Sequence, residues 1–172
     1  MTPNTTTSSS ASRPQFQFIT PESHDELDRV REVFREYASE LGVDLCFQGF
    51  EEELRNLPGD YRGPKGALWL ALVDGELAGC CALRQIDTVD YPNAAEMKRL
   101  FVRKAFRRFG LGRQLAEAAL DAARSAGYHS VLLDTLDDME AARTLYTELG
   151  FEEIPPYYHN PLSGAHYLKV DL

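Results

Sequence analysis

The chain has 172 residues, of which 44% are hydrophobic and 26% charged, and its formal net charge at pH 7 is −9. These values are typical of one globular domain with a sizeable core. The acidic balance argues against a nucleic-acid partner, because general nucleic-acid binders usually carry a basic balance. No stretch of about 18 apolar residues occurs, so we expect neither a membrane span nor a membrane partner.

The cysteines Cys46, Cys80 and Cys81 form no CxxC or His/Cys pattern, so we expect no metal site and no disulfide framework. Cys80 and Cys81 would point to opposite faces of one strand, which prevents a bridge between them. A reducing cytoplasm is the expected location. Residues 1–15 are rich in Thr and Ser and lack the apolar run of a signal peptide, so we expect a disordered tail before a single domain at 16–172.

The first predicted elements are a strand over 16–20 and a helix that ends at Gly42. Apolar residues recur in this helix at helical spacing. Two starts for the helix remain open. Thr20 is one candidate N-cap, since a proline follows it, and a capping box of Ser23 and Glu26 is the other.

Strands and helices then follow along the rest of the chain. We expect a short helix over 50–57, strands over 67–73, 77–86 and 95–102, a helix over 110–126, a short buried strand over 131–133, a helix over 139–149, and closing strands over 151–154 and 165–170. The resulting order, β-α-α-β-β-β-α-β-α-β-β, indicates an α/β (α+β) fold with a mixed sheet and helices on its faces.

Seven of the 18 basic residues lie between Lys98 and Arg113. Within this stretch the glycine-containing turn 107–112 ends an apolar strand and opens a helix. Glycine lets backbone N–H groups approach a ligand closely, and a helix N-terminus carries a partial positive charge. The turn therefore predicts a site for a polyanion such as a pyrophosphate. The alternative is a plain turn before a helix, and a Walker A loop is excluded because no G-K-[ST] follows.

Four segments carry a family pattern in the expected order. They are the strand 96–102, the turn 107–112, the helix segment 142–146 and the Leu-Gly-Phe at 149–151. The pattern is a strand ending in a hydrophobic-x-Val, then Q/R-x-x-G-x-G/A, then A-x-x-L-Y-x-x-x-G-F. Over residues 67–172 the chain resembles the GNAT superfamily of N-acetyltransferases, and the first helices fit more loosely.

The resemblance implies a largely antiparallel sheet of six to seven strands flanked by helices, and no metal. It also implies an N-acetyltransferase that moves an acetyl group from acetyl-CoA to a primary amine by direct attack. The acceptor remains open between a small molecule, a polyamine, an amino acid and a peptide. A longer acyl-CoA donor, a homodimer and a non-catalytic acyl-CoA sensor also remain open.

The resemblance further implies which residues bind the cofactor. The backbone of the strand end would pair with the pantetheine arm, and the turn and helix start would bind the pyrophosphate. These residues are Leu100, Phe101, Val102, Arg107, Arg108, Phe109, Gly110, Leu111, Gly112 and Arg113. The nearby Lys98 and Lys104 are expected to be solvated side chains at a strand edge.

Two residues are implied as catalytic. Tyr146 lies where the family places a tyrosine near the acetyl-CoA sulfur, and a phenol can protonate the leaving thiolate. Glu96 lies where some members have a general base, which an amine acceptor needs because only its neutral form attacks. An ion-paired structural carboxylate is the alternative for Glu96. Asp134 and His159 are weaker candidates with structural roles.

The acceptor site is implied to form between the loop of the first helices and the closing hairpin. Its candidate residues are Phe47, Gln48, Tyr61, Tyr157, Tyr158 and Asn160. Aromatic side chains can form the walls of such a pocket and contact a cation, although packing of the proline-rich loops is an equal explanation.

Three positions depart from the family pattern. Lys104 replaces the usual proline after the strand, Arg108 replaces a glycine of the turn, and Met139 replaces an asparagine before the last helix. We expect Asp137 or Asp138 to cap that helix instead.

Overall fold

The computed structural model describes residues 11–88 and 90–172, and the side chain of Phe47 lies outside the described part. The tail expected at 1–15 is therefore described only from residue 11. The α-helices are α1 (His24–Leu41), α2 (Phe50–Asn56), α3 (Leu111–Ser125) and α4 (Glu140–Glu148), and the short 3-10 helices are η1 (Cys46–Gln48), η2 (Gly59–Tyr61) and η3 (Lys104–Phe109). The strands are β1 (Phe16–Ile19), β2 (Ala67–Val73), β3 (Glu76–Ile86), β4 (Ala94–Val102), β5 (Ser130–Leu136), β6 (Glu152–Ile154) and β7 (Ala165–Asp171).

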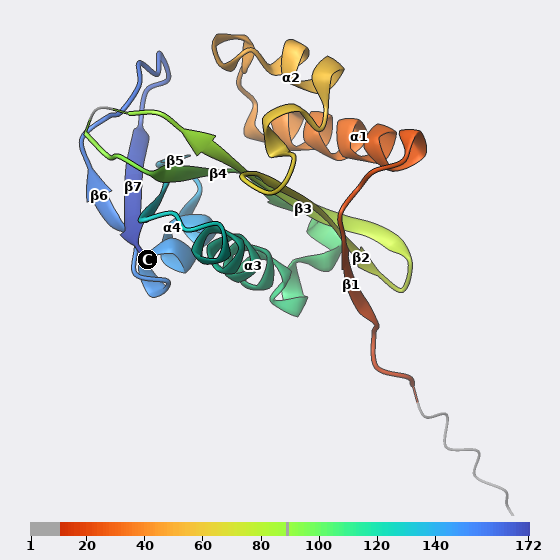
Figure 1. Cartoon of the computed structure of the whole chain (residues 1–172). Helices are drawn as coiled ribbons and strands as arrows, with labels where there is room; N and C mark the ends of the chain where they lie inside the picture. Colours follow the sequence, from red (N-terminus) through yellow and green to blue (C-terminus); the bar gives the residue numbers. More distant parts are fainter. Residues whose placement is uncertain (1–10, 89) are drawn as a thin grey trace, which may run out of the picture.

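Seven strands form one sheet in the order β1-β2-β3-β4-β5-β7-β6. Only β4 and β5 pair in parallel, and all other neighbours are antiparallel. Helices α1 and α2 cover one face of the sheet, and α3 and α4 cover the other (Figure 1). The predicted element order and the mixed, largely antiparallel sheet are confirmed.

Helix α1 begins at the second of the two starts that the sequence leaves open. The Ser23 hydroxyl accepts a hydrogen bond from the Glu26 N–H at 3.2 Å, and the Glu26 carboxylate accepts one from the Ser23 N–H at 3.1 Å. This reciprocal capping box satisfies two N–H groups that a helix end otherwise leaves free. Gly42 ends the helix with a φ of 67°, as predicted from its freedom at positive φ.

The expected cap of α4 is wrong. Met139 occupies the N-cap position and makes no capping hydrogen bond with its side chain. The Asp137 carboxylate instead pairs with His166 on β7, and Asp138 is exposed. An ion pair with a neighbouring strand has therefore replaced the local cap.

Residues of β3 alternate between two cores, one on each face of the sheet. Cys80 belongs to the core under α1 and α2, whereas Cys81 belongs to the core under α3 and α4. Both thiols are free and buried, as predicted from their adjacent positions.

The sheet opens between β4 and β5. The two strands pair only from Ala94 opposite Ser130 to Glu96 opposite Leu132. Beyond these residues they no longer pair with each other. On its other side β4 contains a bulge, where Arg99 has a φ of 60° and one residue of β3 lies opposite two residues of β4. The last residues of β4 therefore have backbone groups that β5 does not use.

A close backbone contact holds β3 against the end of β4. A Cβ atom on Gly79 would lie 2.4 Å from the Phe101 carbonyl oxygen, whereas one on Gly112 would make only ordinary contacts, the nearest at 3.8 Å. We predict that Gly79→Ala lowers the free energy of unfolding by about 1–3 kcal/mol, because the extra methyl group overpacks this contact.

Urea denaturation measures this effect, and Gly112→Ala is the matched control. The control is expected to leave stability unchanged or to raise it slightly, because alanine favours a helix. Equal stability of the Gly79 and Gly112 variants would contradict the close approach of β3 and β4.

Candidate active site

A cavity of about 430 Å³ lies where β4 ends, between the C-terminal end of α1 and the N-terminal ends of α3 and α4. Five of the predicted cofactor residues line it, namely Leu100, Phe101, Val102, Arg107 and Gly112. The other five lie outside its lining: Arg108, Phe109, Gly110, Leu111 and Arg113. Of these, Leu111 is buried in a small cluster with Val73 and Ala78, so only its backbone is free for a ligand.

The start of α3 presents free N–H groups beside this cavity. Gly110 takes the N-cap position with a φ of 72° and has no side chain to cap the helix. The Gln114 N–H makes the first intrahelical bond, to the Gly110 carbonyl at 3.2 Å. The preceding N–H groups of 111–113 are orphan donors of a helix end, which suit an anion.

The arginines around the turn are partly engaged in other contacts. Arg107 donates to the Val102 carbonyl at 2.9 Å and pairs with Glu40 on α1. Arg113 pairs with Glu148 on α4. Arg108 is exposed. The positive charge near the helix start thus comes mainly from Arg108 and from the backbone, with Arg107 held at the cavity wall.

A smaller chamber of about 40 Å³ adjoins the large cavity and shares Tyr37, Leu41, Leu100 and Met139 with it. Its lining is more polar. Gln48, Lys98, Arg99, Asp134 and Tyr146 all contribute to it. These five side chains come from η1, β4, β5 and α4, so the opening between β4 and β5 brings them together.

Tyr146 reaches the chamber from the side of α4. Its ring packs against Phe151 with the centroids 5.5 Å apart, and the residue is 6% exposed. Burial raises the pKa of its phenol well above the usual value. The group therefore stays protonated at neutral pH, as a proton donor must.

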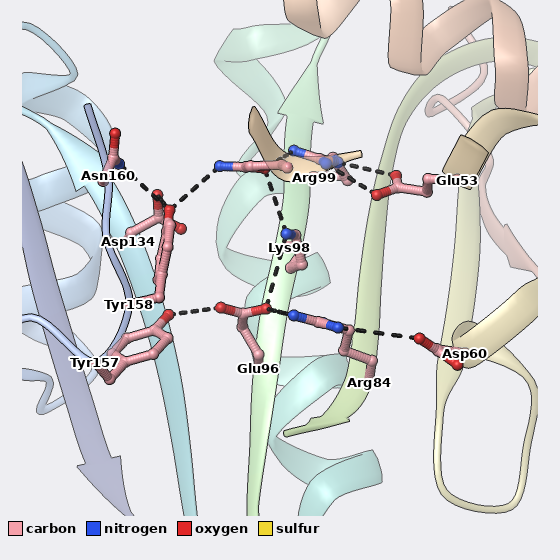
Figure 2. Close-up of polar contacts among 11 residues, drawn as sticks. Glu53, Asp60, Arg84, Glu96, Lys98, Arg99, Asp134, Tyr157, Tyr158 and Asn160 are labelled. Carbon is pink, nitrogen blue, oxygen red and sulfur yellow. Dashed lines mark hydrogen bonds and ion pairs between the residues drawn. The ribbon is translucent and has the colours of Figure 1, made fainter. Parts of the chain in front are cut away.

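Glu96 lies in an ion-paired cluster rather than in the lining of the chamber (Figure 2). Its carboxylate accepts from Arg84 Nε at 2.9 Å and from the Tyr157 hydroxyl at 2.7 Å, and Lys98 Nζ lies 3.8 Å away. Burial raises the pKa of this carboxyl, but Lys98, Arg84 and the Tyr157 hydrogen bond together outweigh burial and hold it below the usual value.

Asp134 has the opposite environment. Its carboxylate accepts a hydrogen bond from the Tyr158 hydroxyl at 2.6 Å, its one such partner among the described residues. Burial raises the pKa of Asp134 above the usual value. A carboxylate with a raised pKa is a better proton acceptor than one held by cations, and it lines the chamber.

Gln48 connects the two sides of the chamber through its amide hydrogen bonds. Its amide oxygen accepts from Arg99 Nη1 at 2.9 Å and from Lys98 Nζ at 3.3 Å. Its amide nitrogen donates to the Tyr158 hydroxyl at 3.3 Å. Asn160 donates to the same hydroxyl, also at 3.3 Å.

A third cavity of about 290 Å³ lies on the outer side of Gln48 and Lys98, which line both it and the chamber. Residues of α2 and η2 form much of its wall, together with Arg84. Tyr61 belongs to this wall but is 5% exposed and packs edge-on against Phe34, so most of its ring serves the core.

A family model described as Acetyltransferase (GNAT) family matches residues 27–151. The chain belongs to the GNAT family. An uncharacterized N-acetyltransferase of Schizosaccharomyces pombe is 36% identical over 148 residues, which cover 86% of this chain and 89% of that protein. An uncharacterized N-acetyltransferase of Dictyostelium discoideum is 30% identical over 209 residues, which cover 88% of this chain and 97% of that protein.

The crystal structure of a GNAT-family acetyltransferase from Staphylococcus aureus has the same fold, with a TM-score of 0.74 at 20% identity over 91% of this chain and 99% of that one. The predicted GNAT fold and superfamily are therefore confirmed, and the chain is an acyltransferase. Within 11–88 and 90–172, no helix is long and apolar enough to cross a membrane, and no three His, Cys, Asp or Glu side chains are grouped to hold a metal ion.

In this GNAT chain the structure groups most of the predicted acceptor residues. Gln48, Tyr158 and Asn160 share one network, and Tyr157 joins it through Glu96. The prediction for Phe47 concerns a side chain outside the described part. The sequence favours a structural role for Asp134 over a catalytic one; the structure places this residue in the lining of the chamber, and its role stays a prediction.

The expectation of a solvated strand edge is wrong for Lys98. Strand β4 lies in the middle of the sheet, and the Lys98 side chain is 10% exposed. Lys104 is exposed, but it lies in η3 rather than on a strand. A run of basic residues does not by itself distinguish a surface strand from a central one.

The two carboxylates are expected to have opposite effects on stability. At pH 7 we predict that Glu96→Gln lowers the free energy of unfolding by about 3 kcal/mol, because it removes the anion from a buried pair with Arg84. Asp134→Asn is expected to raise stability at pH 7, because burial disfavours the charged Asp134 while asparagine keeps an acceptor for Tyr158.

The pH dependence of thermal unfolding checks the signs. The Glu96 contribution is present above the unfolded pKa and is lost as pH falls through the lower folded pKa. The Asp134 penalty is absent below the unfolded pKa and grows as pH rises through the higher folded pKa. Equal shifts of both variants in one direction would contradict these environments.

Proposed function

We propose that the chain transfers an acetyl group from acetyl-CoA to a primary amine of a small molecule, polyamine, amino acid or peptide. One observation carries the proposal: the large cavity begins beside the uncapped start of α3 and continues into a chamber that Tyr146 lines. An elongated ligand with an anionic end and a reacting thioester end fits such a path. We further propose that the protein is cytoplasmic, and a homodimer remains a prediction.

The chain's own groups fit the cosubstrate at both ends. The free N–H groups of 111–113 suit the pyrophosphate oxygens, and the exposed Arg108 adds positive charge. The backbone of Leu100–Val102 faces the opening where β4 has left β5. Its N–H and C=O groups suit the amides of the pantetheine arm as an added strand would.

The proposed step is a direct attack of the neutral amine on the thioester carbonyl carbon. A C–N bond forms, the C–S bond breaks, and the thiolate leaves with the electron pair. Tyr146 gives its phenolic proton to the thiolate and recovers a proton from the nitrogen, which becomes acidic once it is acylated. The amine has first lost its ammonium proton to a carboxylate.

The identity of that carboxylate remains a prediction. Glu96 was predicted for the role, and its ion pairs with Arg84 and Lys98 make it a weak base. Asp134 lines the chamber, and burial raises its pKa. Its hydrogen-bond partner among the described residues, Tyr158, is neutral. A route from Glu96 requires transfer through a water or through Tyr157, whereas Asp134 faces the chamber directly.

The role of Tyr146 predicts a kinetic effect without a binding effect. We expect Tyr146→Phe to lower kcat by about 100-fold or more, because the thiolate loses its proton donor, and to change acetyl-CoA affinity less than about threefold. Release of the CoA thiol and calorimetric titration measure the two quantities.

Tyr128→Phe is the matched control, because that buried tyrosine donates to the Lys65 carbonyl away from the chamber. An unchanged kcat in Tyr146→Phe would remove Tyr146 from the mechanism. Binding of acetyl-CoA with no thiol release for any amine would favour the acyl-CoA sensor instead.

The helix start predicts a charge effect on cosubstrate binding. We expect Gly112→Glu to weaken acetyl-CoA binding by at least about tenfold more than Gly112→Gln, because a carboxylate repels the pyrophosphate while the amide has the same size. Gly112 suits this test better than Gly110, whose φ of 72° would add backbone strain to any substitution.

Calorimetric titration with acetyl-CoA compares the two variants. Equal affinities would show that the anionic end of the cosubstrate does not lie near residue 112.

A further inference from the structure

The charges around the chamber do not all neutralise one another. Three buried or half-buried carboxylates and three cations meet there on β3, β4, β5 and α2, and the exposed Asp60 adds a fourth carboxylate 3.9 Å from Arg84 (Figure 2). The six residues of the inner group are Glu53, Glu96, Asp134, Arg84, Lys98 and Arg99. Two tight pairs are formed. Arg99 binds both oxygens of Glu53 at 2.9 and 3.0 Å, and Arg84 binds Glu96 through two nitrogens at 2.9 Å each.

Lys98 is the cation with the weakest pairing, because its one ion pair among the described residues, with Glu96, spans 3.8 Å. Its ammonium makes a 3.3 Å hydrogen bond to the neutral Gln48 and lies 3.8 Å from a Glu96 oxygen that already accepts both bonds from Arg84. An ammonium has three donors, and a charge buried without a close counter-ion is costly. Because the Lys98 side chain is only 10% exposed and weakly paired, an anionic group of a ligand would stabilise its charge.

Asp134 is the anion that remains. The Tyr158 hydroxyl is its partner, and no described lysine, arginine or histidine forms an ion pair with it. Asp134 and Lys98 line the same chamber beside Tyr146. The register aligns Glu96 with Leu132, so Lys98 and Asp134 each lie two residues further along diverging strands and on the same face of the sheet.

We infer that the acceptor is a free amino acid, whose carboxylate binds the Lys98 ammonium and whose amino group binds the Asp134 carboxylate. This inference rests on the proposed function and narrows its acceptor class. Lys98 also lines the outer cavity of about 290 Å³, so the amino acid would approach Lys98 from a space separate from the large cavity.

The same charges disfavour the other acceptor classes. A polyamine would bring a second ammonium toward Lys98, and like charges in a partly dehydrated site repel strongly. A simple amine would satisfy Asp134 but would leave Lys98 with only its 3.8 Å ion pair to Glu96. A zwitterion matches both residual charges at once.

Binding in this orientation also places the ammonium group of the amino acid beside the carboxylate that removes its proton. The ammonium of the amino acid gives one proton to the Asp134 carboxylate, and its nitrogen gains the lone pair that attacks the thioester carbon. Asp134 then releases that proton to solvent. The Tyr158 hydroxyl, held by Gln48 and Asn160, orients the carboxylate.

The test compares each of the twenty common amino acids as the free acid and as its carboxamide, with spermidine alongside. Thiol release from acetyl-CoA is measured with the full-length wild-type chain. We expect kcat/KM for the preferred free acid to exceed that of its amide by about 30-fold or more, because the amide cannot pair with Lys98.

Two variants test whether Lys98 and Asp134 cause the preference for the free acid. Lys98→Met is expected to raise KM for the free acid, to reduce the acid-to-amide ratio toward one and to leave acetyl-CoA affinity unchanged. Asp134→Asn is expected to lower kcat for both forms. Lys65→Met is the control, since this exposed lysine lies outside the chamber and the outer cavity.

The outcomes separate this inference from the proposed function. Equal or faster turnover of the amides or of spermidine would overturn the amino-acid inference and leave the acetyltransferase intact. Release with none of the acceptors, although acetyl-CoA binds, would overturn both. If Lys98→Met does not fold, the comparison of free acids with their amides in the wild type still tests the amino-acid inference.

Discussion

The early separation of β4 and β5 is the constraint on which the rest of the site depends. The strands share three register positions and then diverge, although each remains paired on its other side, β4 with β3 and β5 with β7. The gap cannot close without breaking those ladders. It therefore leaves the side of Leu100–Val102 that faces away from β3 without a strand partner, and it lets side chains from both faces of the sheet meet in one cavity.

Two arginines at the end of β4 and just after it, Arg99 and Arg103, have a structural use. Arg99 binds Glu53 on α2, and Arg103 binds Glu32 and Glu36 on α1. These pairs hold the layer of the first helices against the strand that carries the site. Both guanidinium groups are therefore already neutralised by carboxylates. A run of basic residues in the sequence thus overstates the positive charge that is left unpaired in the fold.

Two buried carboxylates illustrate how neighbours decide chemistry. Glu96 and Asp134 lie on adjacent strands and the same face of the sheet, yet cations lower the pKa of the first and burial raises that of the second. Divergent environments of this kind are typical of acid–base pairs and of ligand-binding charges. Burial disfavours the ionised form of Asp134, so we expect this carboxylate to cost stability at neutral pH.

The sequence by itself determined the order of elements, the GNAT family and the turn that opens α3, because these depend on periodicity and on short motifs. The capping box of Ser23 and the opposite faces of Cys80 and Cys81 are equally local. Only the tertiary structure decided that Lys98 is buried and that, within the described residues, Asp134 forms no ion pair. Charge compensation depends on partners far along the chain, and the residues from η1 to the closing hairpin meet only when the sheet is assembled.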